Sequence, residues 1–193
     1  MKYQFNKTSM QKIDRQLQAR RRALPTLKAK ETALRVEVQK AQGALENLQL
    51  ELKKFMNAHS QMTRLWVEYP DLLRIKQTDI QERNIAGVKI PVLRGIDFNI
   101  TKAALFHQRA WIVAGTNILK EIVELKITIE LQKQSMQILY RARKKTTQKV
   151  NLYEKVQIPE FQNAIRKIKR FLEDEENLSR ASQKIVKRRT STL

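Results

Sequence analysis

The residues that most often carry chemistry are few and scattered in this sequence. His59 and His107 are the only histidines, and their separation matches no metal-ligand spacing. The absence of cysteine excludes disulfides, thiolate catalysis and cysteine-ligated metals. Four adjacent carboxylates, Glu173 to Glu176, would point in several directions around a helix, which is typical of a solvated face. With no phosphate-binding glycine motif either, the sequence predicts no catalytic residue, no metal site and no cofactor.

The charge of the chain is the stronger functional signal. It has 39 Lys+Arg against 19 Asp+Glu, a formal net charge of +20. Residues 1–30 hold nine basic and one acidic residue, and residues 140–193 hold fifteen basic and six acidic. One basic cluster is usually only a solvated helix surface, but two that converge favour an anionic partner: nucleic acid, anionic lipid or an acidic protein cavity. The candidate contact residues are Arg20, Arg21, Arg22, Lys187, Arg188 and Arg189.

The elements that would position these charges are long helices, because Gly and Pro number only four each and aromatics make up 6%. From about Ser9 to Tyr69, apolar residues recur on alternating steps of three and four, as in a coiled-coil seam; Ile13, Leu17, Leu34 and Val38 are among them. Three polar residues interrupt this seam: Arg20, Glu31 and His59. Pro25 lies inside the segment and predicts a bend, without a break, near Arg21 to Pro25.

The pattern changes after Pro70 to the alternation of a β-hairpin. We expect one strand at roughly Ile75 to Arg83, a turn at Asn84 to Gly87 and a second strand starting at Val88, with Arg94-Gly95 as a competing turn. This connection is far longer than a passive helix–helix turn needs, which predicts a contact surface. Its candidate contact residues are Gly87, Val88, Ile90, Pro91 and Val92.

A second helical stretch should run from a cap at Thr101 to about Lys187. It carries one apolar seam from Ile118 to Leu139 and another from Ile158 to Leu172, out of phase by one residue. Such a slip changes the supercoil locally, and the nearby Pro159 predicts a distortion there.

These elements predict an all-α dominated fold, a long antiparallel two-helix coiled coil with a short central β-hairpin. The expected segments are an N-terminal helix over 1–71, the hairpin region over 72–100, and a C-terminal helix with a basic tail over 101–193. The longest uncharged stretch near the middle is about half of the ~20 residues that a membrane-spanning helix needs, and no signal peptide is evident. We therefore expect a cytoplasmic location without direct membrane insertion.

Three blocks of the sequence resemble one known family, the D subunit of V-type and archaeal A-type rotary ATPases. The stretch Thr147 to Glu154 followed by Ile158-Pro159 is similar to the family's C-terminal signature, although Tyr153 stands where a leucine is usual. Asn84 to Pro91 resembles its hairpin, and Leu17 to Lys30 resembles its first helix. The signature positions are Lys149, Val150, Asn151, Glu154, Ile158 and Pro159.

The resemblance implies a non-catalytic central rotor shaft in a proton- or sodium-transporting ATPase or ATP synthase. Such a shaft enters the hexamer of catalytic A and regulatory B subunits, binds the small F subunit and reaches the subunit that caps the membrane rotor ring. It transmits torque, its hairpin is linked to stimulating ATP hydrolysis, and it is peripheral to the membrane. No nucleic acid is expected as a partner. The alternatives are a basic coiled-coil nucleic-acid-binding protein, although its basic patches lack aromatic stacking residues, and a scaffold protein.

Overall fold

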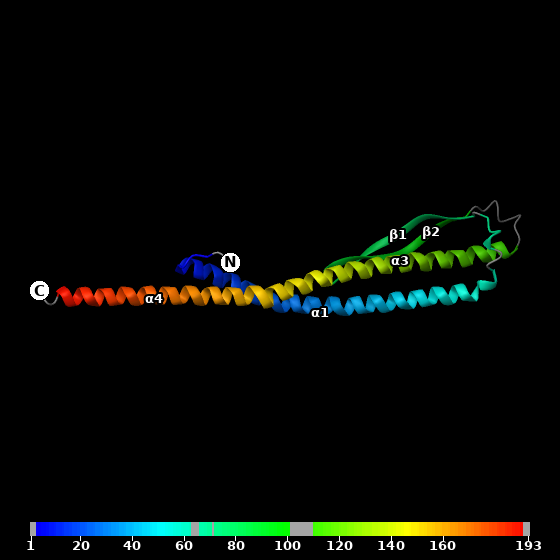
Figure 1. The fold of residues 1–193 in the computed structure, drawn as a ribbon. Helices are drawn as coiled ribbons and strands as arrows, with labels where there is room; N and C mark the ends of the chain where they lie inside the picture. Colours follow the sequence, from blue (N-terminus) through cyan, green and yellow to red (C-terminus); the bar gives the residue numbers. More distant parts are fainter. Residues whose placement is uncertain (1–2, 63–65, 71, 101–109, 191–193) are drawn as a thin grey trace. The chain divides into compact units, whose positions relative to one another are not determined.

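A computed structural model describes residues 3–62, 66–70, 72–100 and 110–190, without the side chains of residues 62, 110, 189 and 190. Long helices dominate it and one antiparallel hairpin lies between them, which confirms the predicted fold class. The elements in chain order are α1 (Lys7–Ala58), the 3-10 turn η1 (Ser60–Met62), β1 (Leu73–Ile85), β2 (Val88–Ile100), α3 (Ala110–Asn151), the π-helix η3 (Leu152–Gln157) and α4 (Ile158–Thr190) (Figure 1).

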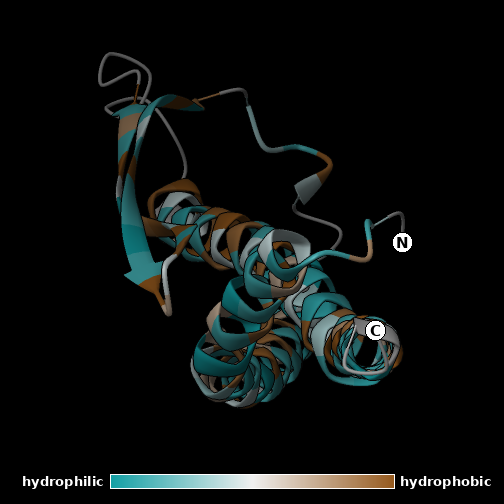
Figure 2. Cartoon of the chain, turned by 90° about the vertical axis from the view of Figure 1, so that its left-hand side faces the viewer, coloured by the Kyte–Doolittle hydropathy of each residue, from teal (hydrophilic) through white to brown (hydrophobic). Residues whose placement is uncertain are grey.

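The chain divides into two compact units, which are described separately. Unit 1 combines Met1–Glu31 with Lys145–Leu193, and unit 2 is Thr32–Lys144. Hydrophilic and hydrophobic residues alternate along the helical ribbons, as the changing colours in Figure 2 show. Each unit has its own apolar core, as expected when helices bury one stripe and solvate the other.

The core of unit 1 is formed by α1 and α4. Ile13 and Leu17 pack against Phe161, Ala164 and Ile168, and Ile168 is completely buried. The order of the contacts shows the direction of packing. Phe5 lies against Phe171, Arg20 against Gln157 and Lys28 against Glu154, so the residue number falls on one helix as it rises on the other. The helices of this unit are therefore antiparallel, as the seam pattern predicts.

Unit 2 pairs the rest of α1 with α3 and adds the hairpin to them (Figure 1). Leu34, Val38 and Ala41 of α1 bury against Leu139 of α3 and Ile90 of β2. Polar contacts join the same elements: Gln132 Nε2 donates to the Ala41 carbonyl at 3.1 Å, and Ser135 Oγ donates to the Pro91 carbonyl at 2.8 Å. The hairpin is therefore packed on the helix pair rather than standing alone, as a two-stranded ribbon requires for stability.

The hairpin turn is tighter than predicted. Ile85 pairs with Val88, and only Ala86 and Gly87 lie between the strands, with φ of 50° and 74°. Two positive φ angles match the mirror-image turn that fits the twist of a two-residue hairpin. The competing turn at Arg94-Gly95 is wrong. The register shifts there instead, since Asp79 pairs with Gly95 but Ile80 pairs with Leu93, and a bulge absorbs Arg94 within a continuous strand.

The end of the first helix departs from the sequence pattern. The first helix ends at Ala58 rather than near Tyr69, and the short 3-10 turn η1 follows it. Pro25 remains inside α1 without a break, as predicted, and it is exposed, so water can solvate the carbonyl that its ring leaves without a donor. The expected cap at Thr101 lies outside the described residues, and the second helix is described from Ala110 onward.

Cysteine cross-linking tests the packing of unit 1, because the native chain has no cysteine. Leu17→Cys combined with Ala164→Cys or Ile165→Cys should form a disulfide rapidly under mild oxidation, visible as a mobility shift in non-reducing gels. Leu17→Cys with Ser182→Cys should not, because position 182 lies roughly 27 Å further along α4 at ~1.5 Å per residue. Preferential cross-linking to Ser182→Cys would contradict the observed register.

Candidate functional site

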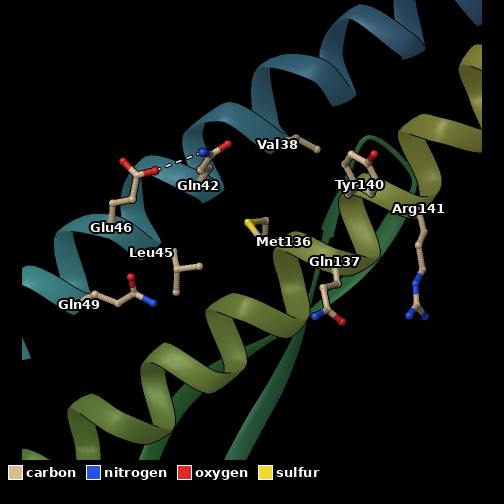
Figure 3. A pocket seen from close by; sticks show the side chains of 9 residues that line it. All are labelled: Val38, Gln42, Leu45, Glu46, Gln49, Met136, Gln137, Tyr140 and Arg141. Carbon is tan, nitrogen blue, oxygen red and sulfur yellow. Dashed lines mark hydrogen bonds between the residues drawn. The ribbon is translucent and has the colours of Figure 1, made fainter.

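A groove lies between α1 and α3 among the described residues of unit 2. Its volume is about 560 Å³. Val38, Leu45 and Met136 supply its apolar part, and Figure 3 shows their side chains between the two helices. Tyr140 stands at its edge and is half exposed. The groove exists because the two helices bring apolar residues together there, and no third element of the described chain lines it.

The rim of this groove is polar. Gln42, Glu46 and Gln49 come from α1, and Gln137 and Arg141 from α3 (Figure 3). Gln42 Nε2 donates to Glu46 Oε1 at 3.2 Å, which holds one side of the rim in place. An apolar floor with a polar rim is the arrangement that accepts one face of an amphipathic helix. The charge and seam patterns do not predict this site, and its one signal in the sequence is an aromatic residue, Tyr140, directly after the seam residue Leu139.

The predicted contact residues of the hairpin differ in how deeply they are buried. Ile90 is buried, and Val88 packs against the same core, so both serve the protein's own fold. The Pro91 carbonyl is likewise engaged by Ser135. Val92 remains accessible at 39% exposure, and Gly87 lies at the exposed turn.

Two other apolar side chains of the hairpin are more exposed than Val92. Ile75 and Ile80 of β1 are 49% and 46% exposed. Lys89 and Glu82 form an exposed pair at 2.8 Å across the strands. The hydrogen bond with Glu82 is the larger cause, and the attraction of the Glu82 charge the smaller one, of a raised pKa of Lys89. Ile75, Ile80 and Val92 together are the exposed apolar residues of the hairpin, and we refer to them as the hairpin trio.

The predicted basic residues are not one cluster. Arg20 is half buried and occupied within unit 1: its Nε donates to Gln157 Oε1 at 2.7 Å, and its guanidinium lies 4.6 Å from the ring centre of Phe161. Arg21 and Arg22 are exposed. Lys187 lies on α4 about thirty residues beyond Gln157, which is roughly 45 Å along a helix at ~1.5 Å per residue.

The two remaining basic candidates, Arg188 and Arg189, come directly after Lys187 in the sequence. Arg188 is exposed beside Lys187, and the side chain of Arg189 lies outside the described residues. The two basic groups would lie together only if the ends of both helices met. In the structure, α4 continues past the level of Phe5, where it packs through Phe171, and every described side chain from Glu173 to Arg188 is exposed.

The polar interruptions of the first seam have specific partners. Glu31 is only 9% exposed and accepts a hydrogen bond from Thr147 Oγ1 at 3.1 Å. His59 is half buried, with Nδ1 2.8 Å from the Phe55 carbonyl oxygen. Hydrogen bonds of this kind offset the desolvation of a polar group in a seam. No cluster of His, Cys, Asp or Glu that could hold a metal occurs in the part of the chain that the structure describes.

The signature residues gather around the π-helical segment. Asn151 directly precedes η3, Glu154 lies within it, and Ile158 and Pro159 follow it. Lys149 and Val150 form the last turn of α3. The one-residue phase slip that the seams predict therefore coincides with a real change of helix type, since a π-turn takes up one more residue than an α-turn.

None of the helices, as far as residues 3–62, 66–70 and 110–190 describe them, is long and apolar enough to span a bilayer. This agrees with the high content of charged residues along all of them.

Comparison with known proteins identifies the family. The family model for the D subunit of ATP synthase matches residues 9–188. The V-type ATP synthase D subunit of Borreliella burgdorferi is 29% identical over 189 residues, covering 96% of this chain and 94% of the relative. The D subunit of Chlamydia muridarum is 29% identical over 172 residues, with 86% and 85% covered, and that of Chlamydia caviae is 30% identical over 159 residues, with 78% and 76% covered. The match spans both helices and the hairpin in a single order, and the chain therefore belongs to the family of ATP synthase D subunits.

Proposed function

We propose that the chain is the central shaft of a V-type ATPase or ATP synthase and that it transmits torque without catalysing a reaction itself. The observation that carries this proposal is the pair of antiparallel helix packings, each with its own continuous apolar core. Such packing stiffens the paired stretches against bending, because the seam residues of one helix are held between those of the other. A shaft whose faces differ would also favour different conformations in successive catalytic sites, which is coupling by differential contact.

The basic surface suits the catalytic end of the shaft. Arg21 and Arg22 of α1 and Lys187 and Arg188 of α4 are exposed at two levels of unit 1. We propose that they face the A and B subunits of the hexamer, where an acidic lining would match their charge. Arg20 is excluded from this set because its guanidinium is engaged by Gln157 and Phe161.

The groove in unit 2 is our candidate site for the small F subunit. We propose that one amphipathic helix of that subunit covers Val38, Leu45 and Met136 and completes a three-helix packing. A helix is the occupant that fits, because the walls of the groove are themselves two helices whose polar side chains lie along the rim (Figure 3). We also propose that the chain contacts the subunit that caps the membrane rotor ring. This role implies a cytoplasmic location, peripheral to the membrane.

Co-expression with the A, B and F subunits, followed by purification, tests the proposed function. The wild-type chain should co-purify with all three in one complex. Tyr140→Glu should abolish retention of F and leave the helicity of the chain unchanged, because it places a charge at the edge of the groove on a half-exposed side chain. An unpaired charge in a desolvated contact costs about 2 kcal/mol or more, equivalent to roughly 30-fold in affinity.

Leu178→Glu is the matched control. Leu178 is an exposed apolar residue on α4 and is 72% exposed. This change should leave F retention intact, since the residue belongs to unit 1 and does not line the groove. Equal loss of F from both variants would contradict the groove as the binding site, whereas failure of the wild-type chain to join the A and B subunits would contradict the shaft itself.

A further inference from the structure

The helical run from Ala110 to Thr190 contains one change of helix type. Residues Leu152–Gln157 form the π-helix η3, and the N–H of Ile158 donates to the carbonyl of Tyr153, five residues earlier. The residues on either side, Asn151 and Ile158, keep ordinary α-helical backbone angles. The change is therefore a local insertion in an otherwise regular helix rather than a break.

The spacing of covered residues explains why an insertion is needed. The buried and half-buried residues along this helix are normally spaced three and four residues apart in turn. Tyr153, Gln157 and Phe161 break this alternation, because each is four residues from the next. A regular α-helix would rotate the later residues away from α1, but a π-turn holds one additional residue and keeps Phe161, Ala164 and Ile168 facing the core of unit 1.

Pro159 favours the same arrangement. It has no N–H to donate to the preceding turn, and in a regular helix its ring would collide with the carbonyl four residues earlier. Kinks and π-turns are the usual ways in which a helix accommodates such a residue. Pro159 and the additional residue therefore both favour a π-turn at this point of the helix.

One side chain of α1 joins both ends of this turn. The Nε of Arg20 donates to Gln157 Oε1 at 2.7 Å, and one of its terminal nitrogens donates to the Gln16 carbonyl at 3.1 Å. The guanidinium also lies 4.6 Å from the ring centre of Phe161 and 5.9 Å from that of Tyr153. A planar guanidinium can stack on rings and donate in its own plane at the same time, which an ammonium cannot.

The segment has little packing of its own. None of its residues is buried. The ion pair between Lys28 Nζ and Glu154 Oε1 is 2.6 Å long, but both side chains are nearly half exposed, and exposed pairs contribute little. The hydrogen bond of Arg20 to Gln157 and its contact with the Tyr153 ring therefore add to the little burial that the segment has.

We propose that η3 is a conformational hinge in which the helix can change its twist without unpacking the core of unit 1, and that Arg20 is the positioning residue that holds it in the π-helical register. The hinge opens locally, through the backbone hydrogen bonds of residues 153–158, while Ala164 and Ile168 stay packed. This property belongs to the chain itself and does not depend on its place in a rotary complex.

Hydrogen exchange on the full chain tests the role of Arg20. Backbone amides at Tyr153 to Ile158 should exchange faster than the amide of Ile168, and Arg20→Ala should accelerate the former by about tenfold and leave the latter unchanged. Arg20→Lys should give only partial protection, because it keeps the charge but loses the planar stacking. Uniform acceleration at Ile168 as well, or none at all, would overturn the positioning role.

Single-residue deletions test the hinge independently. Deleting Val156, which is 51% exposed, together with Pro159→Ala should convert η3 to regular α-helix. The melting temperature should be retained or raised, and the fast exchange should disappear. Deleting the exposed Asn163 in the same Pro159→Ala background should instead shift Ala164 and Ile168 off the core and lower the melting temperature strongly. Equal destabilisation by both deletions would show that the additional residue is not accommodated at η3.

Discussion

Changing the hairpin trio to serine, as Ile75→Ser, Ile80→Ser and Val92→Ser, should reduce the ATP hydrolysis rate of the reconstituted complex severalfold and leave the chain folded. These side chains are 49%, 46% and 39% exposed, so their truncation removes little of the core. They are nevertheless apolar groups on a hairpin that is longer than a helix connection requires. The measurement is the steady-state hydrolysis rate of complexes purified with wild-type or variant chain, with helicity checked by circular dichroism.

The triple variant is a more specific test than removal of the whole hairpin, because it leaves the core of unit 2 in place. Replacing residues 75–98 by a flexible linker would also remove Ile90 from the core of Leu34 and Leu139, and the Pro91 carbonyl from Ser135. Lost activity could then reflect a damaged unit 2. Ile90→Ala is the matched control: it should lower the stability of unit 2 by roughly 2–5 kcal/mol and leave the trio in place. An unchanged hydrolysis rate in the triple variant would show that these three exposed side chains are passive.

Ile168→Ala should lower the free energy of unfolding by roughly 2–5 kcal/mol, because it leaves a cavity in a fully buried site. The measurement is urea denaturation followed by circular dichroism at a fixed protein concentration. The change should destabilise unit 1, because Ile168 packs there with Leu17 and Phe161.

Ile185→Ala is an internal control of the same residue type on the same helix. Ile185 is 55% exposed, so the change should alter stability by no more than about 0.5 kcal/mol. A comparable loss in both variants would contradict the exposed position of Ile185 and would indicate that the distal part of α4 is buried in solution.

The sequence by itself determined the elements that depend on local periodicity. The seam of α1 predicts Ile13, Leu17, Leu34 and Val38 as core residues, and all four are buried. A one-residue slip between two seams predicts a distortion near Pro159, and the π-helix lies there. These inferences succeed because a helix buries every third or fourth residue whatever its partner is, so a change of phase must be absorbed locally.

Only the tertiary structure decided which surfaces are internal and which are exposed. Arg20 and Ile90 looked like contact residues, yet one packs on Gln157 and Phe161 and the other is buried against Leu34. The groove beside Tyr140 and the separation of Lys187 from Arg20 depend equally on the register between helices. A seam repeats every heptad, so it fits its partner nearly as well after a shift of seven residues. The register is instead set by single long-range contacts, such as Glu31 with Thr147 and Gln132 with the Ala41 carbonyl, which no local pattern reveals.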